Sequence, residues 1–393
     1  MYEYYSAGCQ LSNTFGIYVH APWCRRRCPY CNFNVYVERN PKFDIWEKNI
    51  IRDWNRLADN FYSQAHSVYF GGGTPSLVPI KSIQRIAQQL PITKEAECTI
   101  ECNPEDVSPS LLDLYLDIGI NRISLGIQTL QKKFARKLNR ASSTDHNENA
   151  LTLVSKSRFR SWSVDIMFGL PQQTLNDLQA DLSQILQYNP PHISLYGLTF
   201  EENTPFFKAK NNGKIVPIKD EVWQAQFEFI MEKLEDRGYV QYEISNFAQP
   251  GHRSIHNEQI WRNGFYCGLG PGAHGYLPNQ QRTLQPATWA EWLNASGPSF
   301  EKINPEQQTI DAILTWIRHA DGIDLQKLHE KGFAIERRTL IDLENRDVIE
   351  IDVEKQKIYL KRNGYFIADG ITRKLVQSLR RLKMGETWEK KIQ

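Results

Sequence analysis

The chain lacks the long apolar runs and the excess of one charge that mark several large classes of protein. No apolar run reaches the roughly 18 residues that a membrane-spanning helix needs, so no transmembrane segment is expected. Lysine and arginine number 47 against 45 aspartates and glutamates, which gives a net charge of +2. Because a protein that neutralises many phosphates carries a visible basic excess, this balance predicts no nucleic-acid partner. Low-complexity tracts are missing as well, which excludes a disordered or fibrous chain.

The start of the sequence also lacks the features of a secretory signal. Residues 1–6 contain neither a basic region nor an apolar one. The seven cysteines are an odd number in a chain without such a signal. This combination predicts reduced thiols rather than a disulfide framework, and we therefore expect a cytoplasmic protein.

The first two-thirds of the 393 residues alternates short β-branched or aromatic runs with stretches long enough for a helix. The predicted strands are residues 15–20, 67–70, 98–101, 122–126, 163–167 and 192–198. The predicted helices include residues 43–60, 81–90, 109–118 and 175–187. This alternation indicates parallel βα units, which close into a barrel or form an open wound sheet.

The positions of the conspicuous polar residues favour the barrel. They fall at or just after the ends of predicted strands, where (β/α) barrels build their sites. We therefore predict an α/β fold with a partial (β/α)6 barrel in residues 1–245. Residues 246–285 are rich in glycine, histidine and asparagine, and we expect them to form an ordered cap over the barrel mouth.

The pattern changes in residues 286–393, the predicted third part of the chain. Helical stretches at 309–320, 324–330 and 334–344 precede two short strands at 348–353 and 357–361, which we expect to form a hairpin. Three helices and a hairpin indicate a small winged-helix-like module. Its third helix is close to neutral, so we do not interpret the module as a DNA reader.

Three cysteines lie within eight residues, in the order Cys24, Cys28 and Cys31. Thiolates from one short loop can hold a soft metal site. A structural zinc ion would need a fourth ligand, which His20 or Cys9 could supply. An iron–sulfur cluster held by these cysteines alone would leave one iron open to another ligand, and the spacing matches neither of the common ferredoxin patterns.

Other polar or glycine-rich segments follow the next strands. Residues 71–75 read Gly-Gly-Gly-Thr-Pro, and the glycines permit a close approach of the backbone to a ligand. Glu101, Gln128 and Asp165 lie at the end of, or within, the third, fourth and fifth predicted strands. Polar residues at successive strand ends indicate one shared cavity.

With this spacing and order of motifs, the sequence resembles the radical S-adenosylmethionine superfamily. The resemblance implies that Cys24, Cys28 and Cys31 hold a [4Fe–4S] cluster and that S-adenosyl-L-methionine binds its open iron. More narrowly, residues 15–275 resemble the oxygen-independent coproporphyrinogen III oxidase family, and its heme chaperone branch in particular. The matching segments include residues 17–24, 28–33, 192–196, 204–206, 242–248 and 256–261. The nucleotide-contacting positions implied by this resemblance are Tyr18, Tyr30, Gly72, Gly73, Thr74, Glu101, Gln128, Arg140 and Asp165.

Two features favour the heme chaperone branch over the oxidase. In the oxidase a fourth cysteine follows the third after one residue, whereas Phe33 stands at that position here. The oxidase also has a longer segment before its cysteines. The resemblance therefore implies a protein that binds heme and passes it to an acceptor protein. The alternative is a radical enzyme that oxidatively decarboxylates a porphyrinogen.

The resemblance implies heme contacts in the segment His256-Asn257-Glu-Gln-Ile260-Trp261. His256 is the candidate axial ligand of the heme iron, and Trp261 offers a flat apolar wall for the macrocycle. A plainer interpretation is that the His-Asn pair ties backbone groups together. The chain departs from the family at Ile260, where relatives have tyrosine, so a phenol that could bond a propionate is lost.

Two basic stretches have open roles. Arg25, Arg26 and Arg27 lie inside the cysteine loop. Three interpretations are open for them: a solvated face, cations that lower the pKa values of the thiols, or partners of heme propionates. Residues 373–391 carry several cations, which is typical of a surface helix with weak membrane contact.

Overall fold

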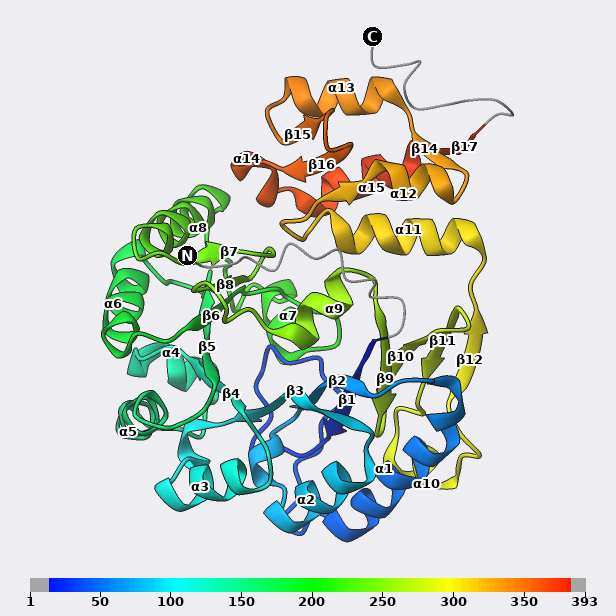
Figure 1. Ribbon diagram of the computed structural model, residues 1–393. Coiled ribbons are helices and arrows are strands. Elements are labelled where there is room, and N and C mark those ends of the chain that lie inside the picture. Colours follow the sequence, from blue (N-terminus) through cyan, green and yellow to red (C-terminus); the bar gives the residue numbers. More distant parts are fainter. Residues whose placement is uncertain (1–13, 383–393) are drawn as a thin grey trace, which may run out of the picture.

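Six parallel strands, with helices between them, form the first two-thirds of the computed structural model, which describes residues 14–382 (Figure 1). These strands are β1 (Phe15–Ala21), β2 (Ala65–Gly72), β3 (Ile92–Cys102), β4 (Arg122–Gln128), β5 (Ser161–Phe168) and β6 (His192–Gly197). Each pairs in parallel with the next in chain order. The sheet does not close on itself. The predicted partial barrel of six βα units is therefore confirmed.

Several of the helices that follow the barrel strands begin at side-chain caps that the sequence supplies. The helices of this part of the chain are α1 (Phe43–Leu57), α2 (Ile80–Gln89), α3 (Pro109–Asp117), α4 (Lys132–Lys137), α5 (Thr144–Ser155), α6 (Leu175–Ile185), α7 (Pro205–Asn211) and α8 (Asp220–Glu235). The side chains of Ser108, Ser143 and Thr174 each accept a hydrogen bond from a backbone N–H of the first turn. Such caps satisfy donors that have no partner within the helix, and so they fix where α3, α5 and α6 begin.

The barrel core lies between the strands and the helices. Side chains such as Ile17, Val68, Ile123 and Val164 are fully buried there. Trp46 of α1 is also fully buried, and its indole N–H donates to the His20 carbonyl oxygen at 2.9 Å. This bond holds α1 against the end of β1, next to the loop that carries the three cysteines.

Residues 246–285 extend the sheet at both edges instead of capping the barrel mouth. On one side β7 (Val240–Gln241) and β8 (Asn246–Ala248) continue from β6. On the other side β9 (Phe265–Leu269) pairs in parallel with β1. The strands β10 (His274–Leu277), β11 (Gln281–Leu284) and β12 (Ser299–Lys302) then follow in antiparallel order. The segment thus contributes sheet strands where the sequence predicted an ordered cap, and two of these strands, β9 and β10, contain glycines on which that prediction partly rested.

Glycine is required where β9 meets β10. A Cβ atom on Gly268 would lie 1.8 Å from the carbonyl oxygen of His274. No side chain can replace hydrogen at that position without moving the backbone. Two further helices lie in this part of the chain, α9 (Ile255–Trp261) and α10 (Trp289–Asn294).

The last part of the chain has its own buried apolar core, which includes Ile313, Leu328, Leu343, Ile358 and Leu375. Its helices are α11 (Pro305–Trp316), α12 (Leu325–Glu330), α13 (Arg337–Asn345), α14 (Arg362–Tyr365) and α15 (Ala368–Gln377). Its strands are β13 (Ile323–Asp324), β14 (Phe333–Ile335), β15 (Ile349–Asp352), β16 (Lys357–Leu360) and β17 (Leu379–Arg381). The predicted hairpin corresponds to the antiparallel pair β15 and β16.

The predicted basic surface helix differs from the structure in its bounds. α15 ends at Gln377, and β17 follows it and pairs with β14. The rest of the basic stretch, residues 383–391, lies outside the described residues.

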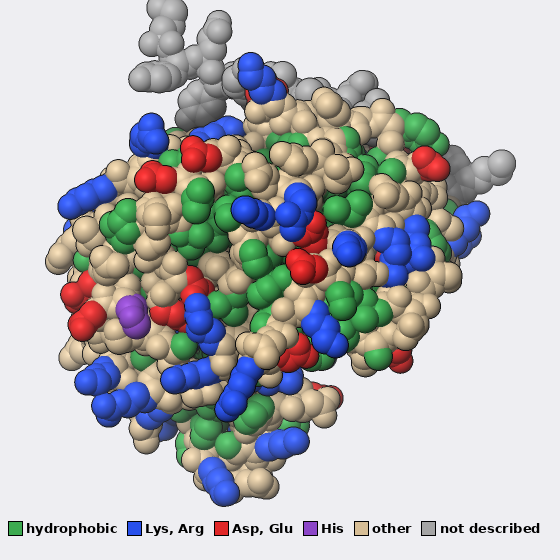
Figure 2. All heavy atoms as spheres, turned by 90° about the horizontal axis from the view of Figure 1, so that it is seen from below, with side chains coloured by type: hydrophobic (Ala, Val, Ile, Leu, Met, Phe, Trp, Pro, Cys, Tyr) green, Lys and Arg blue, Asp and Glu red, His purple; other side chains and the backbone are tan. Residues whose placement is uncertain are grey.

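Within residues 14–382, no helix is both long enough and apolar enough to cross a membrane. Figure 2 shows one face of the molecule, on which cationic and anionic side chains are interspersed over much of the surface.

Candidate functional site

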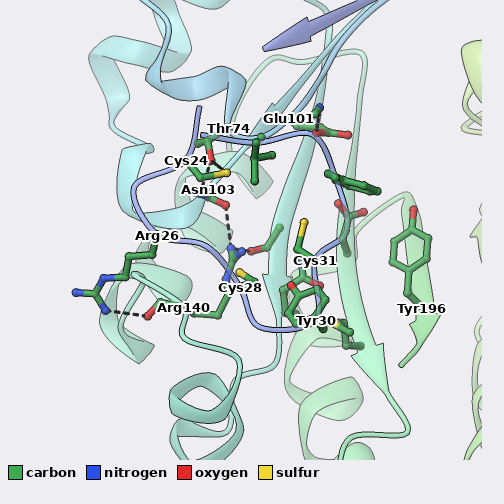
Figure 3. A pocket seen from close by; sticks show the side chains of 18 of the residues that line it. Cys24, Arg26, Cys28, Tyr30, Cys31, Thr74, Glu101, Asn103, Arg140 and Tyr196 are labelled. Carbon is green, nitrogen blue, oxygen red and sulfur yellow. Dashed lines mark hydrogen bonds between the residues drawn. The ribbon is translucent and has the colours of Figure 1, made fainter. Parts of the chain in front are cut away.

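A cavity of about 580 Å³ opens at the carboxyl ends of the barrel strands (Figure 3). Most of the predicted site residues line it, namely Cys24, Cys28, Tyr30, Cys31, Gly72, Gly73, Thr74, Glu101, Gln128, Arg140 and Asp165. The cavity is large enough for a nucleotide-sized ligand. The structure thus brings together residues from the cysteine loop, from four strands (β2 to β5) or the residues directly after them, and from the segment after α4 that carries Arg140.

The cysteine loop follows β1 and is held on both sides. The Cys24 backbone N–H donates to the Tyr36 carbonyl oxygen at 2.9 Å, and the Phe206 backbone N–H donates to the Pro29 carbonyl oxygen at 2.9 Å. Cys24, Cys28 and Cys31 are all free thiols. Burial raises the pKa of the Cys24 thiol to about 11, although the Thr74 hydroxyl and Arg140 act in the opposite direction. Without a metal, this thiol therefore stays protonated at neutral pH.

The donor set fits an iron–sulfur cluster better than a zinc ion. Both ring nitrogens of His20 are engaged, Nδ1 with the Tyr18 hydroxyl at 3.0 Å and Nε2 with the Asn34 carbonyl oxygen at 2.9 Å. His20 is therefore not available as a fourth zinc ligand, and Cys9 lies outside the described residues. Three soft thiol ligands that face one cavity suit a cluster with an open iron.

Across the described part of the chain, no group of three His, Cys, Asp or Glu side chains is arranged to hold a metal ion. Cysteine ligands must lose their protons when a metal binds. Cys24, Cys28 and Cys31 supply the soft ligands that an iron–sulfur cluster needs.

The glycines after β2 allow the backbone to approach the cysteine loop. A Cβ atom on Gly73 would lie 2.6 Å from the Trp23 carbonyl oxygen. Gly72 has a φ of +112°, and a Cβ atom there would lie 2.5 Å from the His20 ring. The Gly73 N–H donates to the Ala21 carbonyl oxygen at 2.8 Å. The predicted need for glycine at these positions therefore has a cause in packing, in addition to any contact with a ligand.

Two partly buried carboxyl groups, those of Glu101 and Asp165, lie in the cavity wall. Glu101 accepts hydrogen bonds from the Tyr69 hydroxyl at 2.9 Å and from the Gly72 N–H at 3.0 Å. Burial, together with the charge of Asp165, raises the pKa of Glu101 to about 7. Burial also raises the pKa of Asp165, against the effect of hydrogen bonds from Ser194 and Ser124. Carboxylates placed in this way can accept hydrogen bonds from hydroxyl or ammonium groups of a ligand.

Arg140 is a partly buried cation in the cavity wall. Its Nη2 atom donates to the Gly126 carbonyl oxygen at 2.6 Å and to Asn103 Oδ1 at 2.9 Å. A guanidinium stays charged in proteins and can meet a carboxylate with a fixed fork of donors. It partly balances the negative charge of the carboxyls and of deprotonated cysteines.

The sequence interpretation missed several residues that line the cavity, among them Asn103, Ser124 and Tyr196. Asn103 follows directly after β3, so the rule that sites lie at strand ends could have found it. Ser124 and Tyr196 lie within strands and gave no comparable signal. The side chain of Tyr196 is 42% exposed although its neighbours in β6 are buried.

Tyr18 is not brought to the cavity by the structure. Its residue is absent from the lining, and its hydroxyl group bonds the His20 ring. The structure therefore gives no support to a contact between the Tyr18 side chain and a nucleotide in this cavity. The cause is its place within β1, since the cavity is built mainly from residues at strand ends.

The segment with His256, Asn257 and Trp261 forms α9 and contributes nothing to the cavity lining. The N-terminus of α9 is held by the Glu97 carboxylate. That carboxylate accepts hydrogen bonds from the Ile255 N–H at 3.0 Å and from the His256 N–H at 3.1 Å. A carboxylate at the positive end of a helix is stabilising, and α9 is thereby tied to β3.

The His256 ring is enclosed inside the barrel. The residue is only 2% exposed, its Nδ1 atom lies 3.0 Å from the Ser67 hydroxyl, and its ring stacks on Tyr69 with centroids 5.2 Å apart. Burial lowers the pKa of His256 to about 3, so the ring is neutral. Its Nε2 atom has no hydrogen-bond partner. The ring has a free nitrogen, but the closely packed surroundings do not fit a heme in this arrangement.

Comparisons with known proteins indicate the same family as the cysteine loop and the cavity. A family model described as the radical SAM superfamily matches residues 18–185. The heme chaperone HemW of Synechocystis sp. is 34% identical over 328 residues, which cover 79% of each chain. The heme chaperone HemW of Escherichia coli is 37% identical over 267 residues, which cover 66% of this chain and 69% of that protein.

A solved structure shares the fold. Coproporphyrinogen III oxidase from Escherichia coli, described as a radical SAM enzyme, superposes with a TM-score of 0.79 over 94% of this chain and 91% of that one. Its sequence identity of 18% makes this a likeness of fold alone. The curated relatives, by contrast, are similar in sequence over most of the chain. The chain therefore belongs to the heme chaperone branch of the radical S-adenosylmethionine superfamily.

Proposed function

We propose that this protein is a heme chaperone that binds heme, one [4Fe–4S] cluster and S-adenosyl-L-methionine, and that passes heme to an acceptor protein. The observation that carries the proposal is the sequence similarity, over 66% to 91% of the chain, to relatives named heme chaperones. Phe33 supports it, since this residue stands where the related oxidase has a fourth cysteine. Its side chain is 58% exposed and lines the cavity.

The cluster is assigned to Cys24, Cys28 and Cys31. When bound, it would offer an open iron to the amino and carboxylate groups of S-adenosyl-L-methionine. Gly72, Gly73 and Thr74 lie beside the cysteine loop and are assigned to the amino-acid end of the nucleotide. This arrangement is supported by the common cavity that these side chains and backbone groups line.

The remaining nucleotide contacts are assigned by charge and by hydrogen-bonding capacity. Glu101 and Asp165 are acceptors for hydroxyl and ammonium groups, and Arg140 is a donor for a carboxylate. Gln128 is the last residue of β4, and its backbone has a φ of +68°. Tyr30 belongs to the cysteine loop and lines the cavity beside these groups.

Heme binding by His256 requires a change of conformation. In the structure the ring is enclosed by Ser67 and Tyr69, so the packing around it must open before the ring can meet a macrocycle. We keep His256 as the heme-ligand candidate for that open state, with Asn257 and Trp261 beside it. Hydrogen exchange of α9 with and without heme tests this assignment, because an open state predicts faster exchange when heme is bound.

The second candidate function is the oxidative decarboxylation of a porphyrinogen. The fold shared with coproporphyrinogen III oxidase and the set of cavity residues favour it. An anaerobic assay with reconstituted protein, S-adenosyl-L-methionine, a reductant and coproporphyrinogen III separates the two functions. We expect no product beyond the amount of enzyme, whereas repeated turnover would refute the chaperone proposal.

We further propose a cytoplasmic location, no nucleic-acid partner and weak membrane contact at most. The free thiols of the described cysteines support the first point. The near-neutral net charge supports the second. Several cations near the end of the chain are paired within the module, such as Lys374 with Asp342 and Arg381 with Glu306, which weakens their attraction to an anionic surface.

A further inference from the structure

Four polar side chains form one hydrogen-bonded series in the cavity wall (Figure 3). Arg140 Nη2 donates to Asn103 Oδ1 at 2.9 Å. Asn103 Nδ2 donates to Thr74 Oγ1 at 3.2 Å. Thr74 Oγ1 in turn donates to Cys24 Sγ at 3.5 Å. The series therefore runs from a partly buried cation to one of the three cysteines assigned to the cluster.

The direction of every bond in this series follows from its first member. A guanidinium has donors and no acceptor, so the Asn103 atom that faces Arg140 must be the amide oxygen. The amide nitrogen then faces Thr74 and must donate to its hydroxyl oxygen. That hydroxyl keeps one proton to give, and the Cys24 sulfur is the acceptor that the structure places beside it.

The fold holds each member of the series in place. Thr74 is 3% exposed and follows β2. The Asn103 N–H donates to the Ser76 hydroxyl at 3.2 Å, which fixes the backbone after β3. The same Arg140 nitrogen also donates to the Gly126 carbonyl oxygen. The hydroxyl is thus aimed at the sulfur by groups from three different strand ends.

We propose that Asn103 is a positioning residue that, through Thr74, directs a hydrogen bond onto the Cys24 thiolate and so raises the reduction potential of the cluster. The inference rests on the proposed function, because it needs the cluster on Cys24. A hydrogen bond to a ligating sulfur stabilises negative charge, and the reduced cluster carries more of it than the oxidised cluster. The chain thereby sets how readily its cluster accepts an electron.

The test uses Thr74 and Asn103 rather than Arg140. The Arg140 guanidinium also bonds the Cys28 thiol, so its removal would act on two cluster ligands together. Thr74→Val keeps the size of the side chain and removes its hydroxyl, whereas Thr74→Ser keeps the hydroxyl. Asn103→Ala removes the amide that orients this hydroxyl. Thr315→Val in α11, which contributes no residue to the cavity, is the matched control.

The measurement is the midpoint potential of the cluster, followed by electron paramagnetic resonance in anaerobically reconstituted full-length protein without the nucleotide. Iron and sulfide contents are measured first, so that only variants with a full cluster are compared. We expect Thr74→Val and Asn103→Ala to shift the potential to more negative values. Thr74→Ser and Thr315→Val should stay at the wild-type value.

The double variant separates positioning from a general disturbance of the site. If Asn103 acts through Thr74, adding Asn103→Ala to Thr74→Val shifts the potential no further, because the hydroxyl is already gone. Additive shifts would overturn the proposed route. Unchanged potentials in both single variants, with full clusters, would overturn the inference and leave the proposed function standing. A wild-type chain that takes up no cluster would overturn both.

Discussion

Glu101 should make the free energy of unfolding depend on pH across neutrality. Its pKa in the folded protein is about 7, against an ordinary value of 4.5, because of burial and the nearby charge of Asp165. The folded state therefore holds this proton up to a higher pH than the unfolded state does. The contribution of Glu101 to stability is fully present below pH ~4.5 and is lost as the pH rises through about 7. At about 1.4 kcal/mol for each pKa unit, the loss between pH 5 and pH 8 amounts to roughly 2–3 kcal/mol.

The variant Glu101→Gln isolates this contribution. The amide does not titrate, and any poorer hydrogen bonding with Tyr69 or Gly72 adds a cost that does not change with pH. The difference in stability between variant and wild type should therefore move by roughly 2–3 kcal/mol in favour of the variant from pH 5 to pH 8. Urea unfolding of the metal-free, reduced protein at four pH values measures it, with Glu202→Gln at an exposed position as the control. Parallel pH profiles for Glu101→Gln and wild type would refute the reasoning.

Three further substitutions test the packing around the site. Glu97→Ala leaves the buried Arg122 without its carboxylate and the first two N–H groups of α9 without their acceptor, and it should cost roughly 3–5 kcal/mol in urea unfolding. A loss under about 1 kcal/mol would contradict this account of the barrel interior. Trp292→Phe removes the indole donor from the buried Asp53. We expect the free energy of unfolding, measured with urea, to fall by about 1–3 kcal/mol. An unchanged midpoint of urea unfolding would contradict this expectation. Phe33→Ala, at a side chain 58% exposed, should change stability by less than about 0.5 kcal/mol and leave iron uptake intact; reduced iron content would show that this side chain supports the cluster loop.

The six barrel strands were predictable because each is a short apolar run that ends in glycine or a polar residue. The cysteine loop was predictable because its spacing is specific to one kind of chemistry. The strand-end rule predicts that Glu101, Gln128 and Asp165 share one cavity, since parallel strands end at the same edge of a sheet. These successes all rest on patterns that are local in the sequence.

The features that the sequence did not predict depend on contacts between distant segments. β9 contains Gly268, and its partner in the sheet is β1, about 250 residues away. Tertiary pairing therefore outweighs the weak strand propensity of this segment. In the same way, the resemblance implies that His256 is a heme ligand, whereas in the structure Ser67 and Tyr69 enclose its ring.

The role of Asn103 was not predictable from the sequence for a third reason. A single asparagine after a strand is common, and its role becomes visible only when Arg140 and Thr74 are seen on either side of its amide. The orientation of that amide follows from the arginine, which lies 37 positions away in the chain. Sequence patterns do not encode such a series, because its members come from separate loops.

The most direct test of the heme chaperone assignment is an anaerobic heme titration of the cluster-reconstituted protein, followed by the Soret band, with His256→Ala measured in parallel. The account predicts a saturable shift at about one heme per chain, with much weaker binding in the variant. Absence of saturable heme binding, together with repeated turnover of coproporphyrinogen III by the same preparation, would contradict it and identify the protein as a porphyrinogen-oxidising enzyme.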